Sequence, residues 1–261
     1  MAVHPKQRRT LREQPLSRLF PNMITIGGLC CGLSAMRFAL GGRWEIAVGF
    51  IIAAAIIDGM DGRVARMLGA TSIFGAQLDS LSDFVCFGVA PPIVLYLWQL
   101  REIKGLGWAV VLFFAVCCAL RLARFNTGIL TENQAPWQKK FFTGVPAPAG
   151  GILCLLPLII SMQFDQEFTL PPAVSLIYAL GVAVLMASRV PTLAAKHVHI
   201  RQEFILPFTI GGAFLLVLFI IEPWWTLSAA SLAYFASILY AVRYYRRLRD
   251  LHAQQISDIA A

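Results

Sequence analysis

Eight apolar stretches constrain this chain more than any other feature of its sequence. Each is close to the roughly 20 residues that a helix needs to cross a hydrocarbon core of about 30 Å. Only 14% of the residues are charged and 58% are hydrophobic, which is outside the range of ordinary soluble domains. The sequence therefore predicts an all-α fold, a polytopic transmembrane helix bundle with spans over residues 21–41, 44–67, 73–100, 106–125, 146–163, 170–189, 204–221 and 225–243.

No long polar linker or evident repeat separates these stretches. We expect a basic cytoplasmic segment over residues 1–20, a single transmembrane domain over residues 21–243 and a cytoplasmic tail over residues 244–261. The first segment precedes a full-length span and lacks a small-residue cleavage site, so it does not resemble a removed signal peptide.

The positions of the 22 lysines and arginines predict how the bundle is oriented. Short cytoplasmic loops carry an excess of these cations, and only four of them fall on the opposite face, namely Arg37, Arg43, Arg101 and Lys104. Both termini should therefore lie in the cytoplasm, which requires an even number of spans. We expect the protein to reside in the inner membrane. The asymmetry also explains the net charge of +8 and suits anionic lipids or an anionic substrate, so nucleic acid is not an expected partner.

Four acidic residues are concentrated where the second apolar stretch ends and the third begins. Asp58 and Asp61 are three residues apart, and Asp79 and Asp83 are four apart, so each pair occupies one helix face. Carboxylates at membrane depth are costly unless they are paired, solvated or bound to a cation. A short connection, residues 69–73, predicts an antiparallel hairpin that brings the two pairs together at the cytoplasmic end.

Four carboxylates gathered in one place need compensating positive charge. Oxygen ligands favour magnesium, manganese or calcium over zinc, so we expect one or two divalent cations. Arg66 lies one helical turn beyond Gly62, where its planar fork of donors can contact phosphate oxygens. The sequence thus predicts a metal site for phosphate chemistry that faces the cytoplasm.

These residues belong to one spaced series of eight positions, which reads Asp58, two residues, Asp61 and Gly62, two residues, Ala65 and Arg66, eight residues, Gly75, three residues, Asp79, three residues, Asp83. The series resembles the signature of the CDP-alcohol phosphotransferases. Members of that family are integral membrane enzymes with a six-helix core. They transfer a phosphoryl-linked group from a CDP-alcohol to a second alcohol and release CMP.

The resemblance implies a role for each position. Asp58, Asp61 and Asp79 would hold two magnesium or manganese ions, with Asp83 completing the centre and acting as the general base. The donor CDP-diacylglycerol would be bound by Gly62, Ala65, Arg66 and Gly75, with a further contact from the hydroxyl of Ser72. Because family members are commonly homodimers, a second copy of the chain is an implied partner.

Three further segments resemble the membrane-embedded phosphatidylserine synthases of bacteria and archaea: residues 20–25, residues 78–91, and residues 121–126 followed by the sequence FFTGVPAP. The implied reaction joins CDP-diacylglycerol and L-serine to give phosphatidylserine and CMP. Serine carries a carboxylate, for which Arg121, Arg124 and Asn126 are the candidate contacts. The alternative role for the two arginines is to anchor the helix at the membrane face.

Two other interpretations remain open. The same chemistry could use glycerol 3-phosphate, inositol phosphate or choline as the acceptor, although an acceptor phosphate should demand a denser basic pocket. The chain could also be a cation or solute transporter. Transporter sites usually lie near the membrane midplane, often between repeats, whereas these acids cluster at one end of one hairpin.

Overall fold

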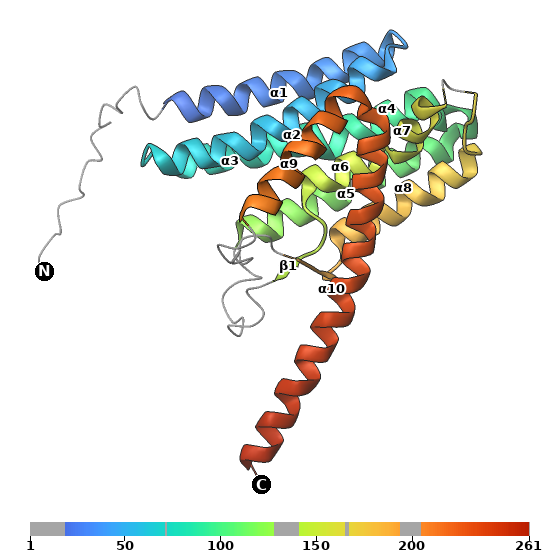
Figure 1. The fold of residues 1–261 in the computed structure, drawn as a ribbon. Coiled ribbons are helices and arrows are strands. Elements are labelled where there is room, and N and C mark those ends of the chain that lie inside the picture. The colour runs from blue at the N-terminus through green and yellow to red at the C-terminus, as the bar shows by residue number, and fades with distance from the viewer. Residues whose placement is uncertain (1–18, 71, 128–140, 165–166, 194–204, 261) are drawn as a thin grey trace, which may run out of the picture.

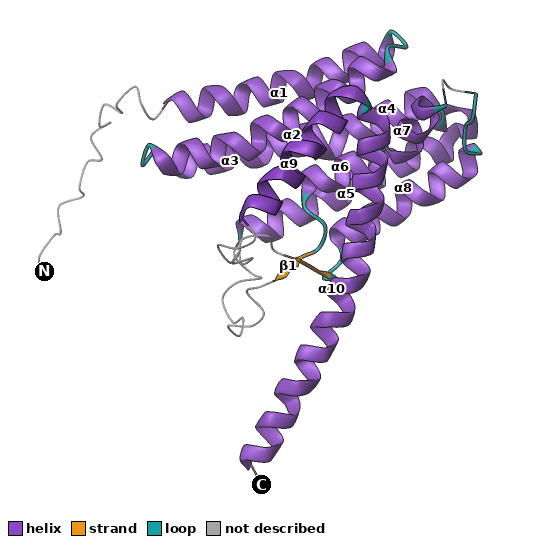
Figure 2. Ribbon diagram, in the orientation of Figure 1, coloured by secondary structure: helices purple, strands orange, loops and turns teal. Residues whose placement is uncertain are grey.

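The computed structural model describes residues 19–260, apart from residue 71 and the segments 128–140, 165–166 and 194–204. Helices make up nearly all of it (Figures 1 and 2). The elements are α1 (Leu19–Leu40), α2 (Trp44–Met67), α3 (Ile73–Asp83), the π-helix η2 (Phe84–Val89), α4 (Ala90–Trp98), the short 3-10 helix η3 (Leu100–Ile103), α5 (Lys104–Asn126), β1 (Phe141–Thr143), α6 (Ala147–Cys154), α7 (Leu156–Gln163), α8 (Pro172–Ala187), β2 (Pro191–Leu193), α9 (Ile205–Ile221) and α10 (Pro223–Ala260).

The predicted all-α architecture is confirmed, because each of the eight apolar stretches folds into helix. The fifth stretch is divided at Leu155, where Pro157 lacks the N–H that would continue the hydrogen-bond ladder. Among the described residues, four helical segments are long and apolar enough to span a membrane: Phe20–Leu40, Ile73–Trp98, Leu100–Asn126 and Pro223–Tyr245. The count of eight spans stays a prediction.

The boundary expected between residues 243 and 244 is not visible in the backbone, since α10 continues as one helix to Ala260. The expected basic segment lies outside the described residues except for its last two positions, which open α1. The division of the chain into these three parts stays a prediction.

The helices pack through small residues. A Cβ atom added to Gly32 of α1 would lie 2.6 Å from the Cys86 sulfur, and one added to Gly88 would lie 2.8 Å from the Cys118 sulfur. Glycines at such positions let neighbouring backbones approach closely, as is common between membrane helices. The hydrophobic core between the helices includes the fully buried rings of Phe87 and Phe114.

Helix α1 packs along α2 and also contacts α3, η2 and α4. By contrast, α2 and α3 make few close backbone contacts with each other. The predicted hairpin exists, but its two arms lie apart beside α1. Their side chains reach into the space between them.

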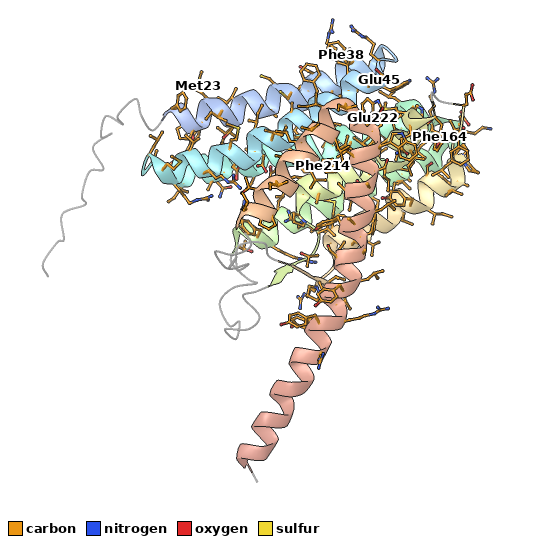
Figure 3. The ribbon with its side chains drawn as sticks, viewed as in Figure 1. Met23, Phe38, Glu45, Phe164, Phe214 and Glu222 are labelled. Carbon is orange, nitrogen blue, oxygen red and sulfur yellow. The ribbon has the colours of Figure 1, made fainter. Side chains whose placement is uncertain are left out.

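Large apolar side chains on the outside of the bundle suit contact with lipid. On α9 they include Leu206, Ile210, Phe214, Leu215 and Ile220, each more than half exposed. Charged residues lie mainly at the ends of the helices. Met23 marks one end of the α1–α2 pair, and Phe38 and Glu45 mark the other (Figure 3). The guanidinium groups of Arg37 and Arg43 lie over the Phe38 ring, 5.5 Å and 5.2 Å from its centroid.

Candidate metal centre

The turn between α2 and α3 is built by local sequence. Gly69 has a φ of +58°, the left-handed conformation in which helices commonly end. Ser72 then begins α3 as its N-cap, because its Oγ accepts a hydrogen bond of 3.0 Å from the Gly75 N–H. This turn directs the last turns of α2 and the first turns of α3 toward the same space.

Three of the four predicted carboxylates converge in that space. Oxygens of Asp58, Asp61 and Asp79 lie within 4.8 Å of one another. Asp61 is buried, whereas the other two are half-buried, and none forms a salt bridge with a described lysine or arginine. Three carboxylate oxygens at this spacing fit a hard divalent cation. The cluster can therefore hold a metal ion.

Asp83 lies beside this cluster and next to α5. Its carboxylate is within hydrogen-bonding range of Asp58. The guanidinium group of Arg121 is close enough to interact electrostatically with both carboxylates. Asp83 thus lies between the cluster of three aspartates and Arg121 of α5.

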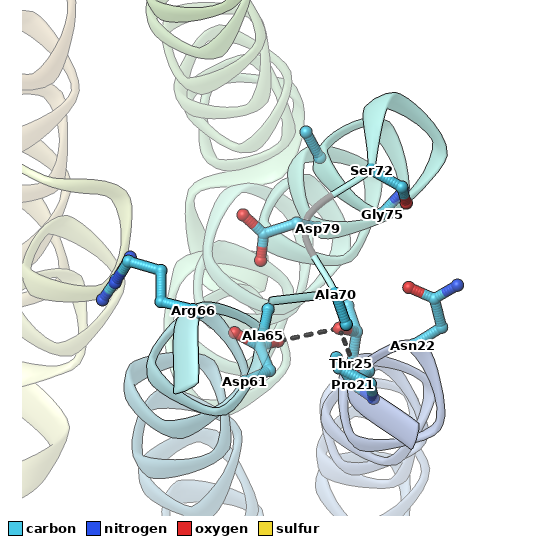
Figure 4. A pocket seen from close by; sticks show the side chains of 12 residues that line it. Pro21, Asn22, Thr25, Asp61, Ala65, Arg66, Ala70, Ser72, Gly75 and Asp79 are labelled. Carbon is cyan, nitrogen blue, oxygen red and sulfur yellow. Dashed lines mark hydrogen bonds between the residues drawn. The ribbon is translucent and has the colours of Figure 1, made fainter. Parts of the chain in front are cut away.

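Thr25 of α1 supports the cluster, a role that the sequence analysis did not assign. Its hydroxyl donates to the Asp61 Oδ2 at 2.8 Å and is also 3.2 Å from the Pro21 carbonyl oxygen (Figure 4). The available signal was its position in residues 20–25, one of the segments that carried the resemblance. This hydrogen bond orients the Asp61 carboxylate within the cluster.

An open pocket of about 180 Å³ adjoins the cluster. In Figure 4, Asp61 and Asp79 lie between Arg66 of α2 and Asn22 of α1. The pocket is lined by Pro21, Asn22, Thr25, Asp61, Gly62, Ala65, Arg66, Ala70, Ser72, Gly75, Ala76 and Asp79. It therefore contains all five residues predicted to bind the donor, together with three from α1.

The surroundings of Gly75 explain why this position of α3 lacks a side chain. An added Cβ would lie 3.1 Å from both the Asn22 Oδ1 and the Ser72 Oγ. Glycine therefore avoids a close contact with these two polar atoms, whose residues both line the pocket.

The three residues predicted to bind serine have different surroundings. Arg121 faces Asp58 and Asp83. The Nη1 of Arg124 donates to the Ala187 carbonyl oxygen at 2.7 Å, which ties α5 to the end of α8. The Asn126 amide nitrogen donates to the Ser80 hydroxyl at 3.0 Å. Only Arg121 is brought to the aspartates.

The fold and the site define a helical membrane protein in which three carboxylates that could hold a metal ion adjoin an open pocket. The sequence model of the family described as CDP-alcohol phosphatidyltransferase matches residues 18–187, and a second one, CDP-alcohol phosphatidyltransferase 2, matches residues 203–238. The chain belongs to the CDP-alcohol phosphatidyltransferase family.

Similar proteins span several groups of organisms. The CDP-diacylglycerol--serine O-phosphatidyltransferase of Mycobacterium leprae is 36% identical over 95% of this chain and 81% of its own length. The Bacillus subtilis protein of that name is 36% identical over 65% of this chain and 87% of its own length. The Saccharomyces cerevisiae protein is 34% identical over 51% of this chain and 47% of its own.

Proposed function

We propose that this protein is a phosphatidylserine synthase, which transfers the phosphatidyl group of CDP-diacylglycerol to the hydroxyl of L-serine and releases CMP. The observation that carries the proposal is the convergence of Asp58, Asp61 and Asp79 beside a pocket lined by the donor-binding positions of the family signature. The names of the similar proteins support serine as the acceptor.

The donor diphosphate fits the pocket between α2 and α3. Arg66 supplies a guanidinium group on one side. Ser72, Gly75 and Ala76 bring the first turn of α3 to the other side, where the positive end of the helix dipole favours an anion. Both contacts place the negative charge of the donor next to the aspartate cluster.

Asp58, Asp61 and Asp79 would hold one or two Mg²⁺ or Mn²⁺ ions, with Asp83 close to the same centre. When bound, such ions neutralise diphosphate charge and stabilise the departing CMP. Asp83 takes the proton from the serine hydroxyl as its oxygen forms a bond to the phosphatidyl phosphorus and the bond from that phosphorus to CMP breaks.

Arg121 is the best-placed of the serine-binding candidates. It lies next to Asp83, so a carboxylate bound to its guanidinium group keeps the serine hydroxyl near the proposed base. Arg124 and Asn126 act less directly, because both are engaged with other parts of the protein.

The protein lies in the inner membrane with its active site facing the cytoplasm. Two chains form a homodimer. The cations support this orientation: Arg63 and Arg66 are at the same end of α2 as the aspartates, whereas Arg37 and Arg43 are at the far end of α1 and just before α2. The dimer rests on the family resemblance, and the mass of the detergent-solubilised protein tests it.

The test of function is CMP release by the purified protein from CDP-diacylglycerol with Mg²⁺ or Mn²⁺. L-serine, glycerol 3-phosphate, inositol, inositol phosphate and choline are offered separately. We expect release with serine only, and its loss on chelation. Asp83→Asn should lower turnover by about 10²-fold or more, the usual contribution of a general base.

Glu45→Gln is the matched control, because it also neutralises a carboxylate of this hairpin but at the far end of α2 (Figure 3). It should leave turnover unchanged. Release with another alcohol alone would replace serine as the acceptor while retaining the chemistry. No release with any acceptor would contradict the proposal.

A further inference from the structure

Helix α10 brings a tyrosine close to Arg121. Tyr234 lies close enough to Arg121 for an electrostatic interaction and is next to Thr192 of β2. The helix is held there by packing against β2 and α7. A side chain from the last helix therefore meets the arginine of α5 that faces Asp58 and Asp83.

Both side chains have a buried polar atom without a hydrogen-bond partner among the described residues. These atoms are the Nε of Arg121 and the hydroxyl oxygen of Tyr234. Buried polar groups in native proteins are nearly always paired, so each exception needs an explanation. Arg121 lies beside a candidate catalytic acid, and the Tyr234 hydroxyl lies between Arg121 and Thr192. Two polar groups from different helices near one another match an anionic ligand group.

We propose that Tyr234 is a specificity-determining residue that donates a hydrogen bond to the carboxylate of the amino-acid acceptor. Arg121 binds the same carboxylate through its guanidinium group. This inference rests on the proposed function, because it requires an acceptor with a carboxylate. It assigns α10, which lies outside the eight signature positions, a part in choosing the acceptor.

Tyr234→Phe removes the hydroxyl and keeps the ring. The measurements are kcat and KM for L-serine, for L-serinamide, in which a neutral amide replaces the carboxylate, and for CDP-diacylglycerol. We expect the KM for L-serine to rise about tenfold, the effect of losing one hydrogen bond to a charged group. The KM for CDP-diacylglycerol and the weaker reaction with L-serinamide should change little.

Tyr178→Phe is the matched control. Tyr178 of α8 also has a buried hydroxyl without a described partner, and its ring lies against Phe235 of α10, 6.0 Å between centroids. Its removal should not alter the KM for L-serine. Tyr234→Leu is a second variant without the donor and should reproduce the rise, with thermal unfolding in detergent reporting whether each variant folds.

Two results would overturn the inference: an unchanged KM for L-serine, or equal rises for L-serine and L-serinamide. If the wild-type protein uses serine normally and Tyr234→Phe is unaffected, only the role of Tyr234 fails. If the wild-type protein does not use serine, the proposed function fails and this inference fails with it.

Discussion

At the scale of single residues, the proposed metal centre is supported by groups other than its carboxylates. Thr25 holds Asp61 through a 2.8 Å hydrogen bond, and Gly75 leaves room for Asn22 and Ser72 at the pocket wall. Each contact fixes the position of a group that a ligand or metal would meet.

Replacing Thr25 by valine should weaken metal binding. The substitution keeps the shape of the side chain but removes the donor to Asp61, and loss of such supporting hydrogen bonds typically lowers metal affinity by about 10- to 100-fold. The measurement is the Mn²⁺ concentration that gives half-maximal CMP release. Thr25→Ser retains the hydroxyl and should behave like the wild type, so equal losses in both variants would contradict this role.

Gly75→Ala should raise the KM for CDP-diacylglycerol severalfold. The added methyl group would press on the Asn22 Oδ1 and Ser72 Oγ, both only 3.1 Å away, and disturb the pocket wall. Gly59→Ala makes the same change on α2, where a Cβ meets nothing within 4 Å. Steady-state kinetics that fail to separate these two variants would argue against the pocket as the donor site.

At the scale of elements, α1 is the support for both arms of the hairpin. It approaches η2 closely at Gly32, where an added Cβ would lie 2.6 Å from the Cys86 sulfur and 3.0 Å from the Cys86 Cα. The first atom can move with its side chain, but the second belongs to the backbone of η2. A larger residue there must therefore separate the two elements.

Gly32→Ala should destabilise the protein by about 1 to 3 kcal/mol, the usual effect of overpacking a close contact. Because α1 carries Thr25 and η2 follows Asp83, we also expect weaker Mn²⁺ activation. Gly27→Ala on the same helix has open space around it and should be neutral or slightly stabilising. Thermal unfolding in detergent compares the two, and similar melting temperatures would refute the assigned contact.

Much of this arrangement was predictable from the sequence. The lengths of the apolar stretches predicted where the helices lie. The three- and four-residue spacings predicted that each aspartate pair shares one helix face. The separation of α2 and α3 was not predictable, because an apolar pattern does not specify which helices become neighbours. For the same reason the sequence did not predict that Thr25 contacts Asp61 or that Tyr234 lies near Arg121. Each pair joins helices that are distant in the sequence.

At the scale of the whole molecule, charge divides the bundle into two ends. Arg66, Arg121 and Arg124 accompany the aspartates, and Arg37 and Arg43 gather around Phe38 at the opposite end. Such a division predicts the direction in which the protein inserts.

Reporter fusions test this orientation. Green fluorescent protein fused after residue 261 should fluoresce, and alkaline phosphatase fused there should be inactive, because we expect the C-terminus in the cytoplasm. Fusions after residue 104 should show the reverse pattern. The same reporter result at both positions would contradict the predicted topology.

The π-helix η2 begins at the residue immediately after Asp83. A π-helical turn contains more residues than an α-helical one, so it changes the phase of the helix between α3 and α4. The face of α3 that carries Asp79 and Asp83 is therefore not in phase with the face of α4 that buries Val94 and Leu95. The π-helical segment sets the relative rotation of α3 and α4. The carboxylates can therefore face α2 while α4 packs into the core.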